Sequence, residues 1–154
     1  MDQPTAREAL RHLEPLVGEW TLEARWPNGE AWPGRVTMEW HSSGAHLIQR
    51  GTLDHPEAPD NVSIIGCDGA NGTYFQLYSD VRGVCRVYQM SITKGEWKVW
   101  REGKPFSQRF QATFSDDGNT ITGRWEIAED GTTYATDFDL IFRRTGTETS
   151  GATA

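Results

Sequence analysis

Most of the chain alternates between apolar and polar residues with a period of two, the pattern of strands that bury one face. Short turns rich in Gly, Asn, Asp and Ser separate most of these segments, and a longer polar loop covers 54–61. Connections this short require antiparallel neighbours. The pattern predicts ten strands, at 20–26, 36–40, 46–53, 62–67, 73–80, 84–92, 97–102, 106–114, 120–127 and 132–144.

An open sheet of ten strands would leave two exposed edges, and closure into a barrel removes them. Barrel diameter grows with strand number, and eight strands can already hold one small ligand. We therefore predict an all-β fold, a ten-stranded antiparallel meander barrel that encloses a cavity. Leu10, Leu13 and Leu16 recur at helical spacing, which predicts one short N-terminal helix that could plug an end of the barrel.

Composition agrees with this prediction. A chain of 154 residues suits one domain, which we place at 1–144, with a disordered polar tail at 145–154. The 7 Trp, 6 Phe, 4 Tyr and 16 Gly favour strands and turns. The formal net charge is -7 and no Lys/Arg cluster stands out, which argues against binding nucleic acid or an anionic membrane.

The expected location is the cytoplasm. No segment approaches the ~18 apolar residues of a membrane span, and the first residues lack the apolar run of a signal peptide. The two cysteines, Cys67 and Cys85, fall on predicted strands that are two apart. Such strands lie roughly 9–10 Å from each other, beyond the ~7 Å Cα limit of a disulfide. We expect two reduced thiols, consistent with a reducing compartment.

The segment 84–92 raises a question about charge inside the barrel. Arg86, Tyr88 and Met90 share one face of this strand with Val84 and Ile92. If that face points inward, Arg86 needs a partner, water or a ligand, because burying an unpaired charge costs several kcal/mol. Our hypothesis is that Arg86 meets an anionic or carbonyl group of a ligand and Tyr88 hydrogen-bonds beside it. A reversed register, with Arg86 in solvent, and an internal ion pair are the alternatives.

Further candidate ligand contacts come from several predicted strands. Gln108 lies between Phe106 and Phe110 on an apolar face, where a buried amide needs partners from a ligand, the backbone or water. His41 and His46 could meet across a hairpin, but two histidines make an incomplete metal site, so we predict no metal. The candidate ligand-binding set is Arg86, Tyr88, Tyr78, Gln108, Trp125, His46 and Met90.

The two ends of the predicted barrel resemble the calycin superfamily of lipocalins, fatty-acid-binding proteins and nitrobindins. The resemblance rests on Gly18 and Trp20, spaced as Gly-x-Trp on the first strand, and on Arg143 and Arg144 at the end of the last. In lipocalins the indole of this motif packs under an arginine from the last strand, which implies a cation–π contact of Trp20 with Arg143 or Arg144. The chain looks most like uncharacterised actinobacterial lipocalin-like proteins, over about 10–144, and this likeness implies a fold but no activity.

The resemblance leaves carrier and enzyme open. The first function is binding of a small hydrophobic or amphipathic molecule with a carboxylate or carbonyl group. The second is a lyase, isomerase or cyclase in which Tyr78, Arg86 and Tyr88 act as acid or polarising groups. A haem protein like nitrobindin is disfavoured, because Leu22 and Ala24 stand where that family has glycines and no histidine follows His55. We therefore expect no cofactor; a homodimer is possible.

Overall fold

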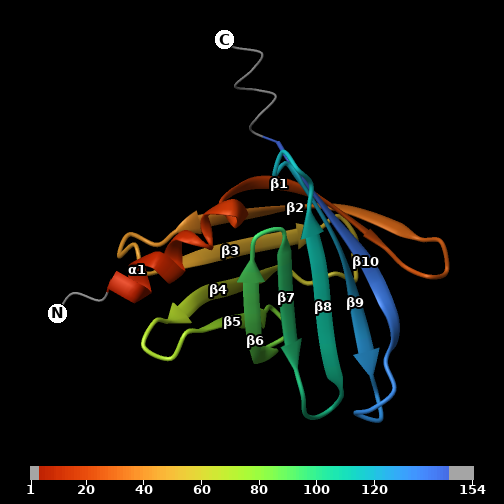
Figure 1. The fold of residues 1–154 in the computed structure, drawn as a ribbon. Helices are drawn as coiled ribbons and strands as arrows, with labels where there is room; N and C mark the ends of the chain where they lie inside the picture. The colour runs from red at the N-terminus through yellow and green to blue at the C-terminus, as the bar shows by residue number, and fades with distance from the viewer. Residues whose placement is uncertain (1–3, 146–154) are drawn as a thin grey trace.

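The structure, a computed structural model, describes residues 4–145, and the predicted tail at 145–154 lies outside the described residues except for Thr145. Within them the chain forms a closed barrel of ten antiparallel strands in sequential order, in which the last strand pairs with the first. This confirms the predicted all-β meander barrel with a short N-terminal helix (Figure 1). The elements are α1 (Pro4–Arg11), the 3-10 helix η1 (Glu14–Leu16), β1 (Gly18–Arg25), β2 (Ala31–Trp40), β3 (His46–Leu53), β4 (Asn61–Asp68), β5 (Thr73–Asp80), β6 (Cys85–Thr93), β7 (Glu96–Arg101), β8 (Ser107–Phe114), β9 (Thr120–Ala128) and β10 (Ala135–Arg144).

The second strand begins five residues earlier than predicted, at Ala31 instead of 36. Its first part contains Pro33 and Gly34, which indicate a turn in the sequence. In the structure the turn is completed before them, where the Trp26 amide donates to Glu30 O at 2.9 Å. Pro33 then lies opposite Glu23 of β1, near the end of the sheet, where a residue without an N–H is tolerated.

The two N-terminal helices close one end of the barrel. Leu13 and Leu16 are fully buried in the core. The Trp20 indole N–H donates to Leu16 O at 2.9 Å, and the Tyr74 hydroxyl of β5 donates to Ala9 O at 2.8 Å. Figure 1 shows α1 beside the ends of β3 and β4, away from the hairpins that join β7 to β8 and β9 to β10. The opposite end of the barrel carries no helix among the described residues.

Arg144 joins the last strand to the residues before the first strand, at the end of the barrel that the helices close. Its guanidinium lies over the Trp20 ring at 4.1 Å and donates to the carbonyl oxygens of Val17, Pro15 and Gly118. The adjacent Arg143 points outward instead. Gly18 has a φ of +139°, and a Cβ at this position would clash with Nη1 of Arg144.

Packed apolar side chains fill the half of the interior next to the helices. The Trp97 ring meets Phe110 edge to face at 5.2 Å and lies 5.8 Å from Phe142. The buried cluster comprises Leu13, Leu16, Trp20, Val36, Met38, Leu47, Ile65, Tyr88, Met90, Ile92, Trp97, Val99, Phe110, Ala112, Ile121 and Phe142.

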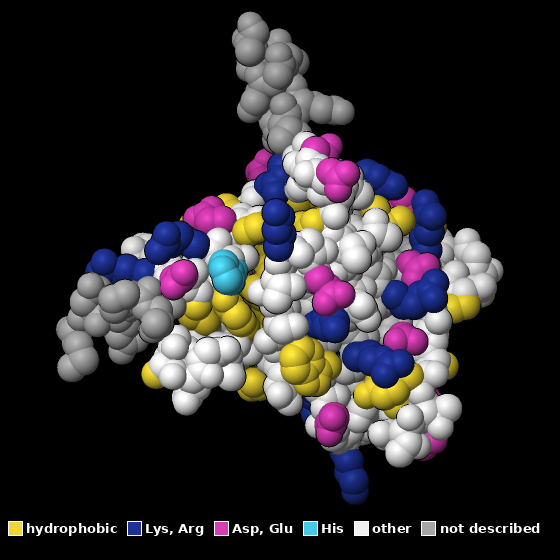
Figure 2. Space-filling view, viewed as in Figure 1, with side chains coloured by type: hydrophobic (Ala, Val, Ile, Leu, Met, Phe, Trp, Pro, Cys, Tyr) yellow, Lys and Arg dark blue, Asp and Glu magenta, His cyan; other side chains and the backbone are white. Residues whose placement is uncertain are grey.

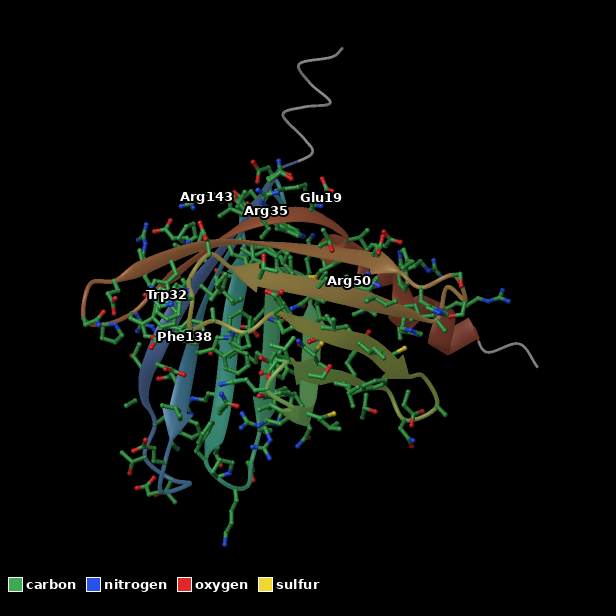
Figure 3. All side chains as sticks on the ribbon, turned by 180° about the vertical axis from the view of Figure 1, so that it is seen from behind. Glu19, Trp32, Arg35, Arg50, Phe138 and Arg143 are labelled. Atoms are coloured by element: carbon green, nitrogen blue, oxygen red, sulfur yellow. The ribbon has the colours of Figure 1, made fainter. Side chains whose placement is uncertain are left out.

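The outer face of the barrel is polar. Figure 2 shows acidic and basic side chains interspersed over one side, and Figure 3 shows Arg35, Arg50 and Arg143 on the outside of the opposite side. Cross-strand ion pairs join Arg109 to Glu126 at 2.7 Å, Arg124 to Asp139 at 2.7 Å, Arg50 to Glu39 at 2.8 Å and Arg143 to Glu23 at 3.2 Å. No helix in the described part of the chain is both long and apolar enough to span a membrane.

Both cysteines are free thiols. Cys67 lies on β4 and Cys85 on β6, and β5 runs between these strands. This is the predicted arrangement of two strands separated by one. Cys85 is exposed, whereas burial raises the pKa of the half-buried Cys67 thiol.

Candidate ligand-binding site

The inner face of β6 carries the arginine that the sequence left open. Tyr88 is 5% exposed and Met90 4%, whereas Val87, which precedes Tyr88 on the strand, is 63% exposed. Side chains alternate across a strand, so Arg86 shares the inward face of Tyr88. Arg86 is half-buried, at the end of the barrel opposite the helices.

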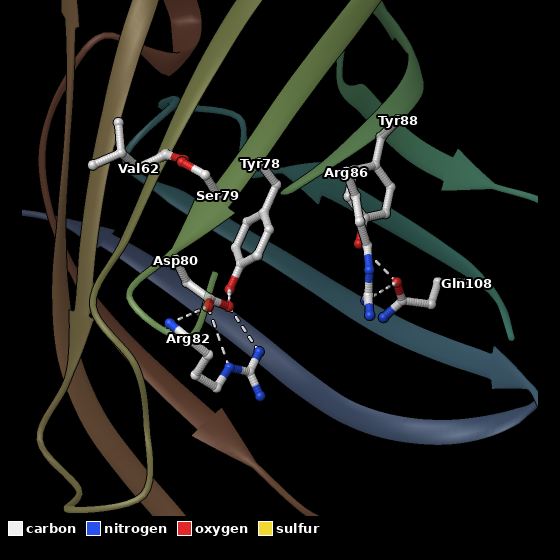
Figure 4. A network of polar contacts seen from close by, with 8 residues as sticks. All are labelled: Val62, Tyr78, Ser79, Asp80, Arg82, Arg86, Tyr88 and Gln108. Atoms are coloured by element: carbon white, nitrogen blue, oxygen red, sulfur yellow. Dashed lines mark hydrogen bonds and ion pairs between the residues drawn. The ribbon is translucent and has the colours of Figure 1, made fainter. Parts of the chain in front are cut away.

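Arg86, Tyr88 and Gln108 form one small cluster inside the barrel (Figure 4). The Tyr88 hydroxyl donates to Gln108 Oε1 at 2.7 Å, and Arg86 Nη1 approaches the same oxygen at 3.5 Å. The Arg86 guanidinium lies 5.1 Å from the Phe106 ring. Among residues 4–145 no carboxylate forms an ion pair with Arg86. Its close polar partners in this part of the chain are therefore neutral: the Gln108 amide, at the limit of hydrogen-bonding distance, and the Tyr88 hydroxyl.

A second cluster lies beside it, around Asp80 at the end of β5. The Asp80 side chain is fully buried and accepts from the Tyr78 hydroxyl at 2.7 Å and from Arg82 Nη2 at 2.7 Å. Arg82, aided by Tyr78, holds the pKa of Asp80 well below its usual range despite its burial. Burial, followed by the hydrogen bond to Asp80, raises the pKa of Tyr78 far above its ordinary value. Asp80 is therefore ionised and Tyr78 protonated at neutral pH.

The Tyr88 hydroxyl is also held in its neutral form. Burial raises its pKa above the ordinary value, although the nearby guanidiniums of Arg86 and Arg101 favour ionisation. A proton donor acts best when its pKa lies near the operating pH. Neither Tyr78 nor Tyr88 meets that condition, so both hydroxyls suit hydrogen bonding better than proton transfer.

Polar side chains continue around this part of the interior and form what we term the polar wall. Gln76 Nε2 donates to Ser63 Oγ at 3.0 Å, and both residues are buried. Arg101, on the inward face of β7, lies opposite Gln108 and donates to the carbonyl oxygens of Lys104 and Phe106. Six adjacent strands, β3 to β8, contribute to the polar wall: Gln49, Ser63, Gln76, Tyr78, Arg86, Tyr88, Arg101 and Gln108.

The remaining strands, β9, β10, β1 and β2, present an aromatic wall. Trp125 is half-buried and meets the Tyr88 ring at 5.9 Å. Trp26 stacks on Phe138 at 4.9 Å and lies tilted against Trp32 at 4.1 Å, and Figure 3 shows Trp32 and Phe138 close together at the end remote from the helix. The half of the interior remote from the helices is thus polar on one side and aromatic on the other.

The polar wall carries more positive than negative charge. Arg86 and Arg101 face the interior without an ion pair among the described residues, and the carboxylate of Asp80 is engaged by Arg82 and Tyr78. The whole chain, by contrast, has a formal net charge of -7. This local excess of positive charge favours an anionic or carbonyl group over a cation.

Two of the seven candidate residues lie away from this cluster. His46 lies on the outer face of β3, because its neighbour Leu47 is fully buried, and its ring stacks on His41 at 4.6 Å. Met90 faces inward within the buried cluster. Tyr88 belongs to the same cluster, but its hydroxyl reaches Gln108 of the polar wall. Arg86, Tyr78, Gln108 and Trp125 are half-buried.

Haem does not fit the histidines of this barrel. His12 is exposed on the helical end, His41 and His46 stack outside, and His55 stacks on Trp32 at 3.6 Å in the β3–β4 loop. None of them projects inward from a strand. Within residues 4–145, no group of three or more His, Cys, Asp or Glu side chains is arranged to hold a metal ion.

Sequence reasoning missed Asp80, Arg101 and Gln49. Asp80 has the parity of Tyr78, so the period-two pattern of β5 contained a signal for it. Arg101 likewise shares the face of the buried Trp97 and Val99. The signal for Gln49 was weaker, because β3 has an apolar residue on each face, Leu47 and Ile48.

No protein-family model matches the sequence, and no curated protein matches it. Among solved structures, Rv2717c from M. tuberculosis is 13% identical with a TM-score of 0.60, over 89% of this chain and 97% of that chain. A de novo designed fluorescence-activating β-barrel is 15% identical with a TM-score of 0.45, over 86% and 95%. The barrel EF1p2_mFAP2b bound to DFHBI is 13% identical with a TM-score of 0.46, over 89% and 99%. The likeness to the M. tuberculosis protein shows a shared barrel fold and nothing about function.

Proposed function

We propose that this barrel binds a small amphipathic molecule whose carboxylate or carbonyl group meets Arg86. The observation that carries the proposal is the state of Arg86, which faces inward and is half-buried, and whose close polar partners among the described residues are neutral: the Gln108 oxygen at 3.5 Å and the Tyr88 hydroxyl. A charged group in such a place needs a counter-charge or water. The nearby Tyr88 hydroxyl is a second group placed for the same ligand atom, since it could turn from Gln108 to the ligand.

The two walls support this choice of ligand class. The aromatic wall offers Trp125 and Phe138 to an apolar body, and the polar wall offers charged and amide groups to a polar end. Binding pockets for small molecules commonly combine a mostly apolar lining with a few polar groups that fix orientation. We further propose that the protein is related to actinobacterial lipocalin-like proteins and is located in the cytoplasm.

An enzyme that uses Tyr78, Arg86 and Tyr88 is the second candidate. The placement of a hydroxyl and a guanidinium around one oxygen favours it, because such a pair could polarise a substrate carbonyl. The raised pKa values of both tyrosines count against acid catalysis. Binding is therefore the function that the geometry supports best.

The first test is native mass spectrometry of the purified protein beside a denatured spectrum of the same sample. We expect an additional mass that denaturation releases, and the same spectrum gives the oligomeric state. A ligand recovered with changed mass after incubation would instead favour the enzyme.

The second test uses 2-naphthoate, a flat aromatic carboxylate, in calorimetric titrations. Arg86→Gln should weaken binding roughly ten- to a hundredfold, the range for a lost hydrogen bond to a charged group. Arg109→Gln, the same change on the outer face of β8, is the matched control and should bind as the wild type does. Equal affinity of Arg86→Gln and wild type would refute the proposed role of Arg86.

A further inference from the structure

Gln49 brings a buried oxygen without a hydrogen-bond partner into the same interior. It has the inward parity of Leu47 and Gly51 on β3, both of which are buried. Its Oε1 is shielded from solvent and accepts no hydrogen bond from the described residues. Buried polar atoms are nearly always hydrogen-bonded, so an exception in a native fold calls for a ligand or an ordered water.

The nearest protein groups are already engaged with one another. Ser63, the register partner of Gln49, accepts at its hydroxyl from Gln76 Nε2 at 3.0 Å. Tyr78, the next residue in the row, donates to Asp80 at 2.7 Å. The Ser63 hydroxyl keeps its own proton to donate, but it forms no hydrogen bond to Gln49 Oε1, so among the described residues this oxygen has no donor.

Gln49 and Arg86 stand at the two ends of one row of inward side chains. Strand register pairs Gln49 with Ser63, Ser63 with Tyr78 and Tyr78 with Arg86. Neighbouring strands are ~4.8 Å apart, so three spacings separate the two ends by roughly 14 Å along the sheet. Inward side chains converge across the curved wall, which brings the two polar ends within reach of a single small molecule.

We propose that Gln49 is a second anchor of the ligand, whose Oε1 accepts a hydrogen bond from a hydroxyl or N–H group. This rests on the proposed function, since the carboxylate or carbonyl at the other end of the ligand meets Arg86. The ligand class is then a flat, elongated carboxylic acid or carbonyl compound that carries a hydrogen-bond donor at its far end. The aromatic wall accounts for the flat body, and the two polar groups fix its direction.

The test compares 6-hydroxy-2-naphthoate with 2-naphthoate, two probes that differ only in a donor opposite the carboxylate. Calorimetry would give their affinities for the wild type, Gln49→Leu and Gln89→Leu. Gln89 is an exposed, outward glutamine of β6, so its change to leucine is the matched control. In the wild type and the control we expect the hydroxyl to tighten binding roughly two- to tenfold, the net effect of one hydrogen bond. In Gln49→Leu that preference should vanish, with the affinity for 2-naphthoate retained.

Thermal unfolding without ligand gives an independent readout. Gln49→Leu should unfold at a higher temperature than the wild type, because it removes a buried polar group without a partner. A lower unfolding temperature would show that the amide has a structural role and would overturn the inference. So would a hydroxyl preference that survives in Gln49→Leu, or no preference in the wild type while 2-naphthoate still depends on Arg86. If neither probe binds the wild type, the proposed function fails and this inference falls with it.

Discussion

Replacing Arg144 with alanine should weaken the closed end of the barrel. The change removes the guanidinium over Trp20 and its hydrogen bonds to the carbonyl oxygens of Val17, Pro15 and Gly118. These contacts tie the 3-10 helix and the β8–β9 hairpin to the last strand. The truncation leaves the part-buried Val17 oxygen without this donor.

The expected loss follows from these contacts. A cation–π contact at a partly exposed site contributes ~1 kcal/mol. Hydrogen bonds from a charged group contribute ~1.5–3 kcal/mol each when buried, but Arg144 is only half-buried and its bond to Gly118 is long at 3.4 Å. Burial of the charge opposes these gains, as the lowered pKa of Arg144 indicates. We expect a net loss of about 3 kcal/mol in the free energy of unfolding, or ~6–12 °C in Tm.

Urea unfolding followed by tryptophan fluorescence would measure the loss. Arg143→Ala is the matched control: this neighbouring arginine has an exposed side chain paired with Glu23, and exposed pairs contribute only ~0–1 kcal/mol. If Arg144→Ala loses no more stability than Arg143→Ala, the assignment of Arg144 to closure is wrong.

Three further predictions follow from local geometry. Gly18→Ala should cost about 1–3 kcal/mol of unfolding free energy through its positive φ and the clash with Arg144, and a double-mutant cycle should show a smaller cost in Arg144→Ala. Asp80→Asn should destabilise the protein by ~2 kcal/mol at pH 7, through lost hydrogen bonds to an ionised carboxylate. Because the folded pKa of Asp80 is depressed, this difference in stability is fully present above the unfolded pKa of ~3.9 and shrinks as pH falls below it. Tm values of both proteins from pH 7 to pH 2 test this, and a Tm difference that stays constant down to pH 2 would contradict it. Iodoacetamide should label the exposed Cys85 faster than the half-buried Cys67, as peptide mass mapping would show, and equal rates would contradict the burial of Cys67.

The strands were more predictable than the way they face. Short turns and period-two alternation were enough for ten strands and their antiparallel order, because both signals are local. These signals did not show which face of β3 points inward, because Leu47 and Ile48 are both apolar. A shift of one residue turns every side chain of a strand to the other face. The candidate set therefore included His46, which shares the outward face of Ile48, and left out Gln49 on the other face. Packing against β2 and β4 decides between the two faces, and that information lies in distant parts of the chain.

The candidate site was predictable where polar residues share a face with apolar ones. Arg86 and Tyr88 alternate with the exposed Cys85 and Val87. Arg86 and Tyr88 therefore share one face of β6, whichever face points inward. The partners of a side chain were harder to foresee. Gln108 meets Tyr88 because β8 and β6 both flank β7, and the registers of these two strand pairs, which the local pattern does not give, bring the two side chains together.

The pairing of the first strand with the last has a consequence for synthesis on the ribosome. β1 emerges early, yet its partner β10 is the last strand to leave the exit tunnel. Until then the growing chain is an open sheet with a free edge at β1, and such edges invite association with other chains. Long-range pairings of this kind also slow folding. The nascent barrel is therefore most exposed to misassembly just before β10 arrives, and Trp20 gains the cover of Arg144 only when that strand has been made.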